Sequence, residues 1–127
     1  MRSRTPRGSA AVEFALVLPV LLLVVLAIAQ VGLLARDQLL LTQAARAAAR
    51  EAAVTSDGSA VRSAALEAAP ALDAGILSVD IVWGATPGDP VEVALRYPAP
   101  LRVPFVDAVM PNSVELMTNA AMRREFP

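Results

Sequence analysis

The chain has 127 residues, eleven basic and twelve acidic side chains, a formal net charge of −1, and neither histidine nor cysteine. The commonest zinc ligands and the usual base of a serine or cysteine nucleophile are therefore missing, and the charge balance offers no polyanion-binding surface. We expect no enzyme, no metal site, no cofactor and no direct binding of nucleic acid, in a chain with room for one small domain beside any membrane segment.

A basic segment, residues 1–8, precedes a long apolar run from Phe14 to Ala35. The segment carries three arginines: Arg2, Arg4 and Arg7. Three residues interrupt the run: Pro19, Gln30 and Gly32. As a helix the run would be about 33 Å long, enough to cross a hydrocarbon core of roughly 30 Å. The sequence therefore predicts a transmembrane helix over residues 9–35.

Glu13 is the unusual residue, because a carboxylate at the mouth of an apolar helix loses hydration and needs a positive partner. A cut between Gly8 and Ser9 would create an α-amine four positions before Glu13, and such residues share a helix face. At 4 Å the pair would gain about 4 kcal/mol at an effective dielectric near 20, before desolvation is subtracted. We predict that the Ser9 amine pairs with Glu13, within one chain or between neighbouring chains.

The residues from Gly8-Ser9 to Glu13-Phe14, after a basic leader and before a continuous apolar helix, resemble the processing site of type IV prepilins and pseudopilins. The fuller string, through Pro19, is similar to the TadE-like family of the tight-adherence (Flp) pilus system. Resemblance to that family's closing strands returns in three later segments: Val91 to Tyr97, Pro98 to Pro104, and Ala121 to Glu125.

The resemblance implies a membrane-anchored minor pilin or pseudopilin, cut between Gly8 and Ser9 by a prepilin peptidase and taking part in pilus assembly and adhesion. It implies further partners: other pilins, met through the hydrophobic helix, and an inner-membrane assembly platform. It places residues 1–8 in the cytoplasm and an extracytoplasmic domain, residues 36–127, outside the bacterial cytoplasmic (inner) membrane or in a surface pilus. Pro19 is either a bend that aids packing in a filament or a tolerated membrane proline.

Two other interpretations remain open. Residues 14–26 followed by Ala27-Ile28-Ala29 fit a secretory signal peptide, whose removal would release a soluble binding domain beginning at Gln30. Glu13 and the apolar residues beyond Gln30 count against this interpretation. The second alternative is an unprocessed single-pass anchored domain, in which Glu13 would be replaceable.

The helical pattern continues beyond the apolar run, to about Val54. Four residues follow Leu34 at helical spacing on one face: Leu41, Ala45, Ala48 and Ala52. The opposite face is polar: Arg36, Gln43, Arg46 and Arg50. The sequence thus predicts one long rod, half in lipid and half in water, whose alanine seam either packs closely against the domain or reflects only helix propensity.

The remaining residues predict a turn, a second helix and a small sheet. The turn covers residues 55–59 and the helix residues 60–69, which Pro70 ends. Alternating patterns predict strands over residues 77–83, 91–97 and 114–122. The predicted fold is α+β: a long N-terminal helix packed on a short helix and a three-stranded antiparallel sheet, similar in outline to pilins.

Three details complete the prediction. Trp83 and Tyr97 are expected to face one another across the first hairpin. The prolines between the second and third strands predict a loop, with a helical turn over residues 105–110: Pro98, Pro100, Pro104 and Pro111. Residues 123–125 are either a surface contact or a solvated terminus.

Overall fold

The computed structural model describes residues 6–105, 108 and 111–125, and its longest element is one continuous helix. Five elements follow one another along the chain: α1 (Pro6–Val54), α2 (Gly58–Ala68), β1 (Ser78–Val82), β2 (Pro90–Pro100) and β3 (Ser113–Arg123). The strands form one antiparallel sheet in the order β1-β2-β3. The predicted α+β fold is confirmed, including the end of the long helix at Val54.

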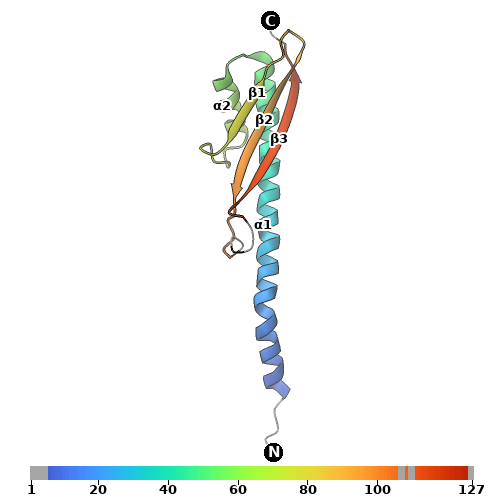
Figure 1. Ribbon diagram of the computed structural model, residues 1–127, viewed down its shortest axis with the longest axis vertical. Coiled ribbons are helices and arrows are strands. Elements are labelled where there is room, and N and C mark those ends of the chain that lie inside the picture. Colours follow the sequence, from blue (N-terminus) through green and yellow to red (C-terminus); the bar gives the residue numbers. More distant parts are fainter. Residues whose placement is uncertain (1–5, 106–107, 109–110, 126–127) are drawn as a thin grey trace, which may run out of the picture.

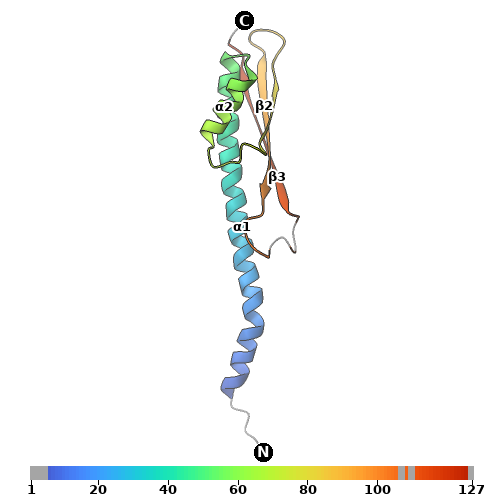
Figure 2. The ribbon, with the colours of Figure 1, turned by 90° about the vertical axis from the view of Figure 1, so that its left-hand side faces the viewer.

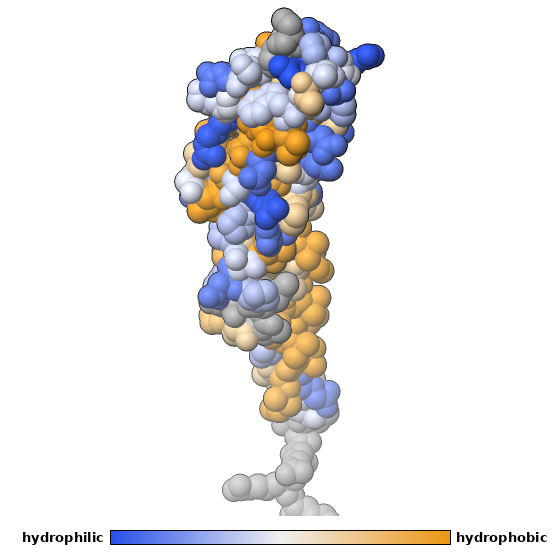
Figure 3. Space-filling view, turned by 45° about the horizontal axis from the view of Figure 1, so that its top comes forward, coloured by the Kyte–Doolittle hydropathy of each residue, from blue (hydrophilic) through white to orange (hydrophobic). Residues whose placement is uncertain are grey.

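The sheet and α2 both lie against the upper half of α1, as Figures 1 and 2 show from two sides. In this half α1 contacts α2, β2 and β3. The lower half projects alone toward the N-terminus, and Figure 3 shows apolar side chains along it, below a mixed and largely polar surface. The molecule is therefore a rod that carries a small domain along one half of its length.

The face of α1 that meets the domain is built almost entirely from alanine. Its buried apolar residues are Leu41, Ala44, Ala45, Ala48, Ala49, Ala52 and Ala53. Because alanine has only a methyl side chain, both α2 and the sheet can approach the helix backbone closely. The predicted seam is confirmed as a packing surface, and it is wider than predicted. The predicted polar face, which includes Arg46 and Arg50, is exposed.

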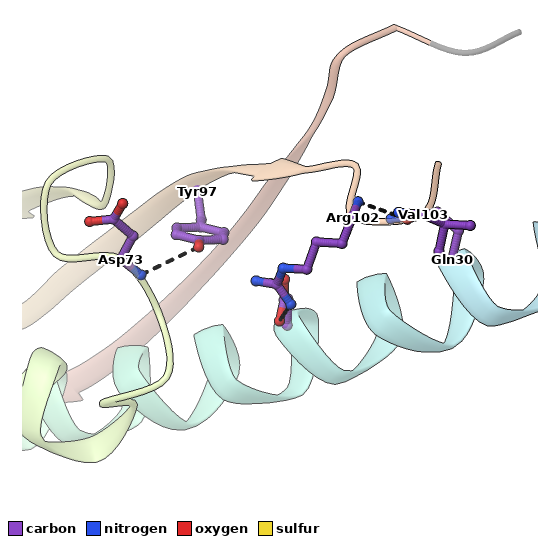
Figure 4. A network of polar contacts seen from close by, with 6 residues as sticks. Gln30, Asp73, Tyr97, Arg102 and Val103 are labelled. Carbon is purple, nitrogen blue, oxygen red and sulfur yellow. Dashed lines mark hydrogen bonds and ion pairs between the residues drawn. The ribbon is translucent and has the colours of Figure 1, made fainter. Parts of the chain in front are cut away.

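The central strand, β2, supplies the other side of the core. Every second side chain on it is buried: Val91, Val93, Leu95, Tyr97 and Ala99. Tyr97 is 1% exposed, and its phenol oxygen accepts a hydrogen bond of 3.3 Å from the backbone N–H of Asp73 (Figure 4). This bond satisfies the one polar group of an otherwise apolar strand face, and it fixes the loop between α2 and β1.

The predicted loop at Pro98 and Pro100 is wrong, because β2 continues through both residues to its end. The pairing with β1 reaches only Arg96, so beyond that residue β2 has a free edge on the β1 side. Residues two apart point their backbone nitrogens to the same side of a strand, and prolines lack the N–H that a ladder needs. The two prolines are therefore tolerated where no β1 partner lies beside them.

The second helix begins at Gly58, two residues before the predicted start. Asp57 is its N-cap: its carboxylate accepts a hydrogen bond of 2.9 Å from the backbone N–H of Ser59 and another of 2.7 Å from the Ser59 hydroxyl. A capping carboxylate lets the helix start within a segment that reads as a turn in the sequence. Val61 and Ala65 are its buried residues.

Trp83 and Tyr97 do not face one another. Ser78 pairs with Arg96 and Val82 pairs with Glu92, so the two aromatic residues lie beyond opposite ends of the β1–β2 pairing. Across the β2–β3 pairing, Tyr97 lies opposite Leu116. Of the helical turn predicted over residues 105–110, four residues lie outside the described part of the chain. Of the other two, Ala108 is in a 3₁₀ turn, whereas Phe105, with a φ of 68°, is not helical.

The upper end of the domain is closed by the residues that follow β3. The Arg124 guanidinium donates to the carbonyl of Gly84 at 2.9 Å, and the Arg124 backbone bonds to Gly88 and Asp89 of the same hairpin turn. The Glu125 N–H donates to the carbonyl of Ala53 at 2.9 Å, in the last turn of α1. Residues 124 and 125 thus join the hairpin to the helix end, a role that neither prediction for the terminus included.

Candidate functional site

The predicted processing bond, Gly8–Ser9, lies near the start of α1, which begins at Pro6. The space around the Gly8 α-carbon is open, since a β-carbon added there would have no neighbouring atom within 4 Å. The Ser9 hydroxyl donates to a carboxylate oxygen of Glu13 at 3.4 Å, and both residues are exposed. The structure therefore brings these residues together on one helix face. The pairing of Glu13 with a freed amine stays a prediction.

The helix that follows is apolar and uncovered. Its most apolar 18-residue window has a mean hydropathy of 2.9, and none of that window is buried. A core helix of a soluble protein would be mostly buried, whereas this one exposes large apolar side chains on all sides, Phe14 at 62% among them. By length and composition α1 can cross a membrane, and it is consistent with a single-pass anchor.

Pro19 lies inside α1, and the helix continues on both sides of it. Proline removes one backbone hydrogen bond within a helix, and membrane helices tolerate this loss when neighbouring groups compensate. The proline lies in the uncovered half, far below the first contact with the sheet. Both interpretations of Pro19 remain open.

The domain is hydrogen-bonded to α1 at Gln30, a residue inside the predicted transmembrane range. Gln30 is 2% exposed, and its side-chain oxygen accepts hydrogen bonds from the backbone N–H groups of Arg102 and Val103, each 3.0 Å long. These two residues follow β2 in the connection to β3, which folds down against the helix (Figure 4). A single amide side chain thus satisfies two backbone donors of a segment outside regular structure.

Two helical turns above Gln30, Asp37 forms an ion pair with Arg102. The guanidinium contacts the carboxylate at two points, Nη2 to Oδ2 at 3.1 Å and Nη1 to Oδ1 at 3.3 Å. The Asp37 side chain is 3% exposed and that of Arg102 is 34% exposed. Such a two-point contact fixes orientation as well as charge, and it compensates the burial of the carboxylate.

Sequence reasoning missed Gln30, Asp37 and Arg102 as a group. A signal was present in the sequence, since Gln30 and Asp37 are seven residues apart and therefore share a helix face, among apolar neighbours. Their partner on a distant loop carried no such signal. Within the residues that the structure describes, no group of three or more histidine, cysteine, aspartate or glutamate side chains is placed to hold a metal ion.

Comparison with known proteins adds one match. Residues 8–50 match the family model described as TadE-like protein. No curated protein and no solved structure matches the chain. The matched range begins at Gly8, crosses the whole uncovered helix and ends within the buried alanine seam. Residues 8–50 are thus similar to the TadE-like family, as the resemblance of the sequence implied.

Proposed function

We propose that this chain, which is similar to the TadE-like family over residues 8–50, is a membrane-anchored minor pilin or pseudopilin that takes part in assembling a tight-adherence pilus. The observation that carries the proposal is the contact between Ser9 and Glu13 at the open end of an uncovered apolar helix. A carboxylate at the end of an apolar helix is stabilised by a neighbouring cation. A cut after Gly8 creates such a cation, the α-ammonium group of Ser9.

The proposed processing step is hydrolysis of the Gly8–Ser9 peptide bond by a prepilin peptidase. The cut leaves a carboxylate on Gly8 and an ammonium group on Ser9, while Glu13 stays one helical turn away. Among the described residues of the uncut chain, the neutral Ser9 hydroxyl donates to Glu13 over a long 3.4 Å. A charged donor makes a shorter and stronger hydrogen bond, so the cut strengthens the pair that holds the helix end in the membrane.

The proposed partners are the peptidase, other pilins that pack against the uncovered helix, and an inner-membrane assembly platform. In this proposal the N-terminus is cytoplasmic and the domain above Gln30 lies outside the cytoplasmic membrane. The absence of hydrophobic cover along the lower helix supports such packing, because in a filament neighbouring helices would replace lipid as the apolar surroundings.

The experiment that tests the proposal is the intact mass and N-terminal sequence of the protein from membranes of cells that also produce the prepilin peptidase of its own host. A chain that begins at Ser9 supports the proposal. A chain that begins at Gln30 replaces it with a secreted domain, and an uncut chain leaves only an anchor.

Two variants serve as matched controls for this measurement. Gly8→Leu should block the cut, because a branched side chain replaces the small residue at the bond. Ala29→Leu alters the possible signal peptidase site in the same way and should leave the start at Ser9 unchanged. The opposite pattern, with cleavage lost only in Ala29→Leu, would overturn the proposal.

A further inference from the structure

We propose that the segment from Leu101 to Phe105, hereafter the foot, rests in the outer interface of the same membrane that α1 crosses, with the Phe105 ring among the lipids. The inference rests on the proposed membrane anchoring of α1, and it adds a second point of membrane contact. It assigns a lipid surface as the partner of a loop that belongs to the folded domain.

The first argument is the level of the foot along α1. Twenty helical residues rise about 30 Å, the thickness of a hydrocarbon core. Counted from Ser9, the first residue of the predicted transmembrane range, the twentieth residue is Ile28. Counted from Phe14, where the apolar run begins, it is Leu33, and Gln30 lies between these two limits. Gln30 is the residue that binds the backbone of Arg102 and Val103. The foot is therefore tied to the helix at the level where the outer edge of the hydrocarbon lies.

The second argument is the exposure and backbone of Phe105. Its side chain is 69% exposed, although the other aromatic residues that the structure describes in this domain, Trp83 and Tyr97, are at least partly buried. Its φ of 68° lies in the left-handed region, which bulky side chains rarely adopt. A phenylalanine held outward at such a backbone angle has little apolar cover from the described residues of its own domain, and the membrane interface supplies that cover.

The third argument is where the charge of the foot goes. Arg102 is the one charged residue in the sequence of residues 101–105, and its side chain runs along α1 away from the uncovered half (Figure 4). Its guanidinium ends at Asp37, seven residues above Gln30, or about 10 Å higher along a helix. The charged end of Arg102 thus lies on the water side of the foot, and the remaining side chains of the foot are apolar. Arginine side chains commonly extend toward water in this way at membrane surfaces.

Continuity with the helix favours lipid as the occupant. Below the foot, on the face of α1 that carries Gln30, Leu26 is half-buried and Leu23 is 48% exposed, so this part of the helix needs an apolar environment of its own. Because Gln30 and Asp37 fix the foot to this helix, a bilayer that surrounds the helix reaches Phe105 as well. A second copy of the chain is the competing occupant, and the experiment below distinguishes it.

The native chain has no cysteine, so single cysteines can carry a nitroxide spin label without background. Three variants of the full-length chain are compared in phosphatidylcholine bilayers: Phe105→Cys in the foot, Leu22→Cys in the uncovered helix, and Val82→Cys, 66% exposed at the far end of the domain. Collisions with oxygen report lipid, and collisions with a water-soluble nickel chelate report water.

The expected result is high oxygen collision for position 22, nickel collision for position 82, and an intermediate depth for position 105. If the label at position 22 is deep in the bilayer but the label at position 105 collides with nickel as freely as that at position 82, the proposed lipid contact of the foot is wrong. The proposed membrane anchoring of α1 is then still supported. Nickel collision at position 22 would overturn both. Protection of position 105 from both reagents, with dipolar broadening between labels, would assign it to a second copy and overturn the lipid proposal.

Discussion

Asp37 and Arg102 lie 65 residues apart in the chain and form a two-point ion pair, with 3.1 Å between Oδ2 and Nη2. Arg102→Met should lower the free energy of unfolding by about 2–4 kcal/mol, because it leaves a buried carboxylate without its cation. Urea unfolding of the full chain in detergent, followed by the fluorescence of Trp83, measures the loss.

The other ion pair of the described residues is the matched control. Arg96 and Asp80 approach only to 3.9 Å, with both side chains more than half exposed. Arg96→Met should therefore cost at most about 1 kcal/mol. The double variant Asp37→Asn with Arg102→Met should recover part of the loss, since no buried charge remains. Equal losses for Arg96→Met and Arg102→Met would contradict the structural role assigned to the buried pair.

Glu13→Ala should leave processing largely intact but impair pilus assembly, because the cut depends on Gly8 whereas the freed amine needs the carboxylate. Ser9→Ala is the control: it deletes the hydroxyl that contacts Glu13 at 3.4 Å but keeps the α-amine, so assembly should continue. N-terminal sequencing measures processing, and the amount of sheared surface pilus measures assembly. Normal pili in Glu13→Ala, together with their loss in Ser9→Ala, would mean that the hydroxyl and not the charge matters.

Gly84→Ala should destabilise the domain by about 2 kcal/mol, as overpacking does. A β-carbon at Gly84 would collide with Asp89 and would lie 3.0 Å from the carbonyl oxygen of Pro90, inside the hairpin turn that Arg124 holds. Gly58→Ala is the matched control, because its new methyl group would meet Trp83 at 3.7 Å, an ordinary contact. Chemical unfolding should show no loss for it, and a gain of up to about 1 kcal/mol is expected for a glycine replaced in a helix.

Acid should weaken the domain through Asp89. The Thr86 hydroxyl and, second, the Thr86 N–H donate to its carboxylate, each at 2.8 Å, and hold the pKa of Asp89 below its ordinary value. A pKa that is lower in the folded than in the unfolded chain adds stability above about pH 4, and this stability is lost as pH falls through the folded pKa. The difference in urea midpoint between the native chain and Asp89→Asn should therefore be present at pH 6 and shrink toward pH 3.

The N-cap carboxylate gives a second test of the same kind. The Ser59 hydroxyl, followed by the Ser59 N–H, lowers the pKa of Asp57, so Asp57→Asn should lose the same pH dependence. A profile that is the same in the native chain, Asp89→Asn and Asp57→Asn would show that neither hydrogen-bonded carboxylate contributes to the acid sensitivity.

Local patterns were enough to predict the elements and their types. Helical spacing from Leu41 to Ala52 placed the end of α1 at Val54, and alternation placed all three strands, because both periodicities follow from how side chains leave a helix or strand. The same reasoning brought Ser9 and Glu13 to one face. These predictions depend only on residues that are close in sequence.

The errors arose where the outcome depends on a distant partner. The strand β2 passes through Pro98 because β1 ends beside Arg96, and the sequence does not state where a neighbouring strand ends. The register that separates Trp83 from Tyr97 is a property of the pairing and not of either strand. The foot and its ion pair are further cases, because Asp37 and Arg102 meet only after the sheet has packed on the helix.

The two attachments of the sheet to α1 have a mechanical consequence. Gln30 holds the connection below β2 and β3, and the Ala53 carbonyl holds Glu125 after β3, so the sheet acts as a splint over about 35 Å of helix, at 1.5 Å per residue. Bending of the splinted part would break one of these attachments or shear the alanine seam. Bending of α1 is therefore easiest below Gln30, where Pro19 removes one hydrogen bond from the backbone. A pull on the domain would be absorbed as a change of tilt in the apolar half, and the domain would transmit the load without deforming.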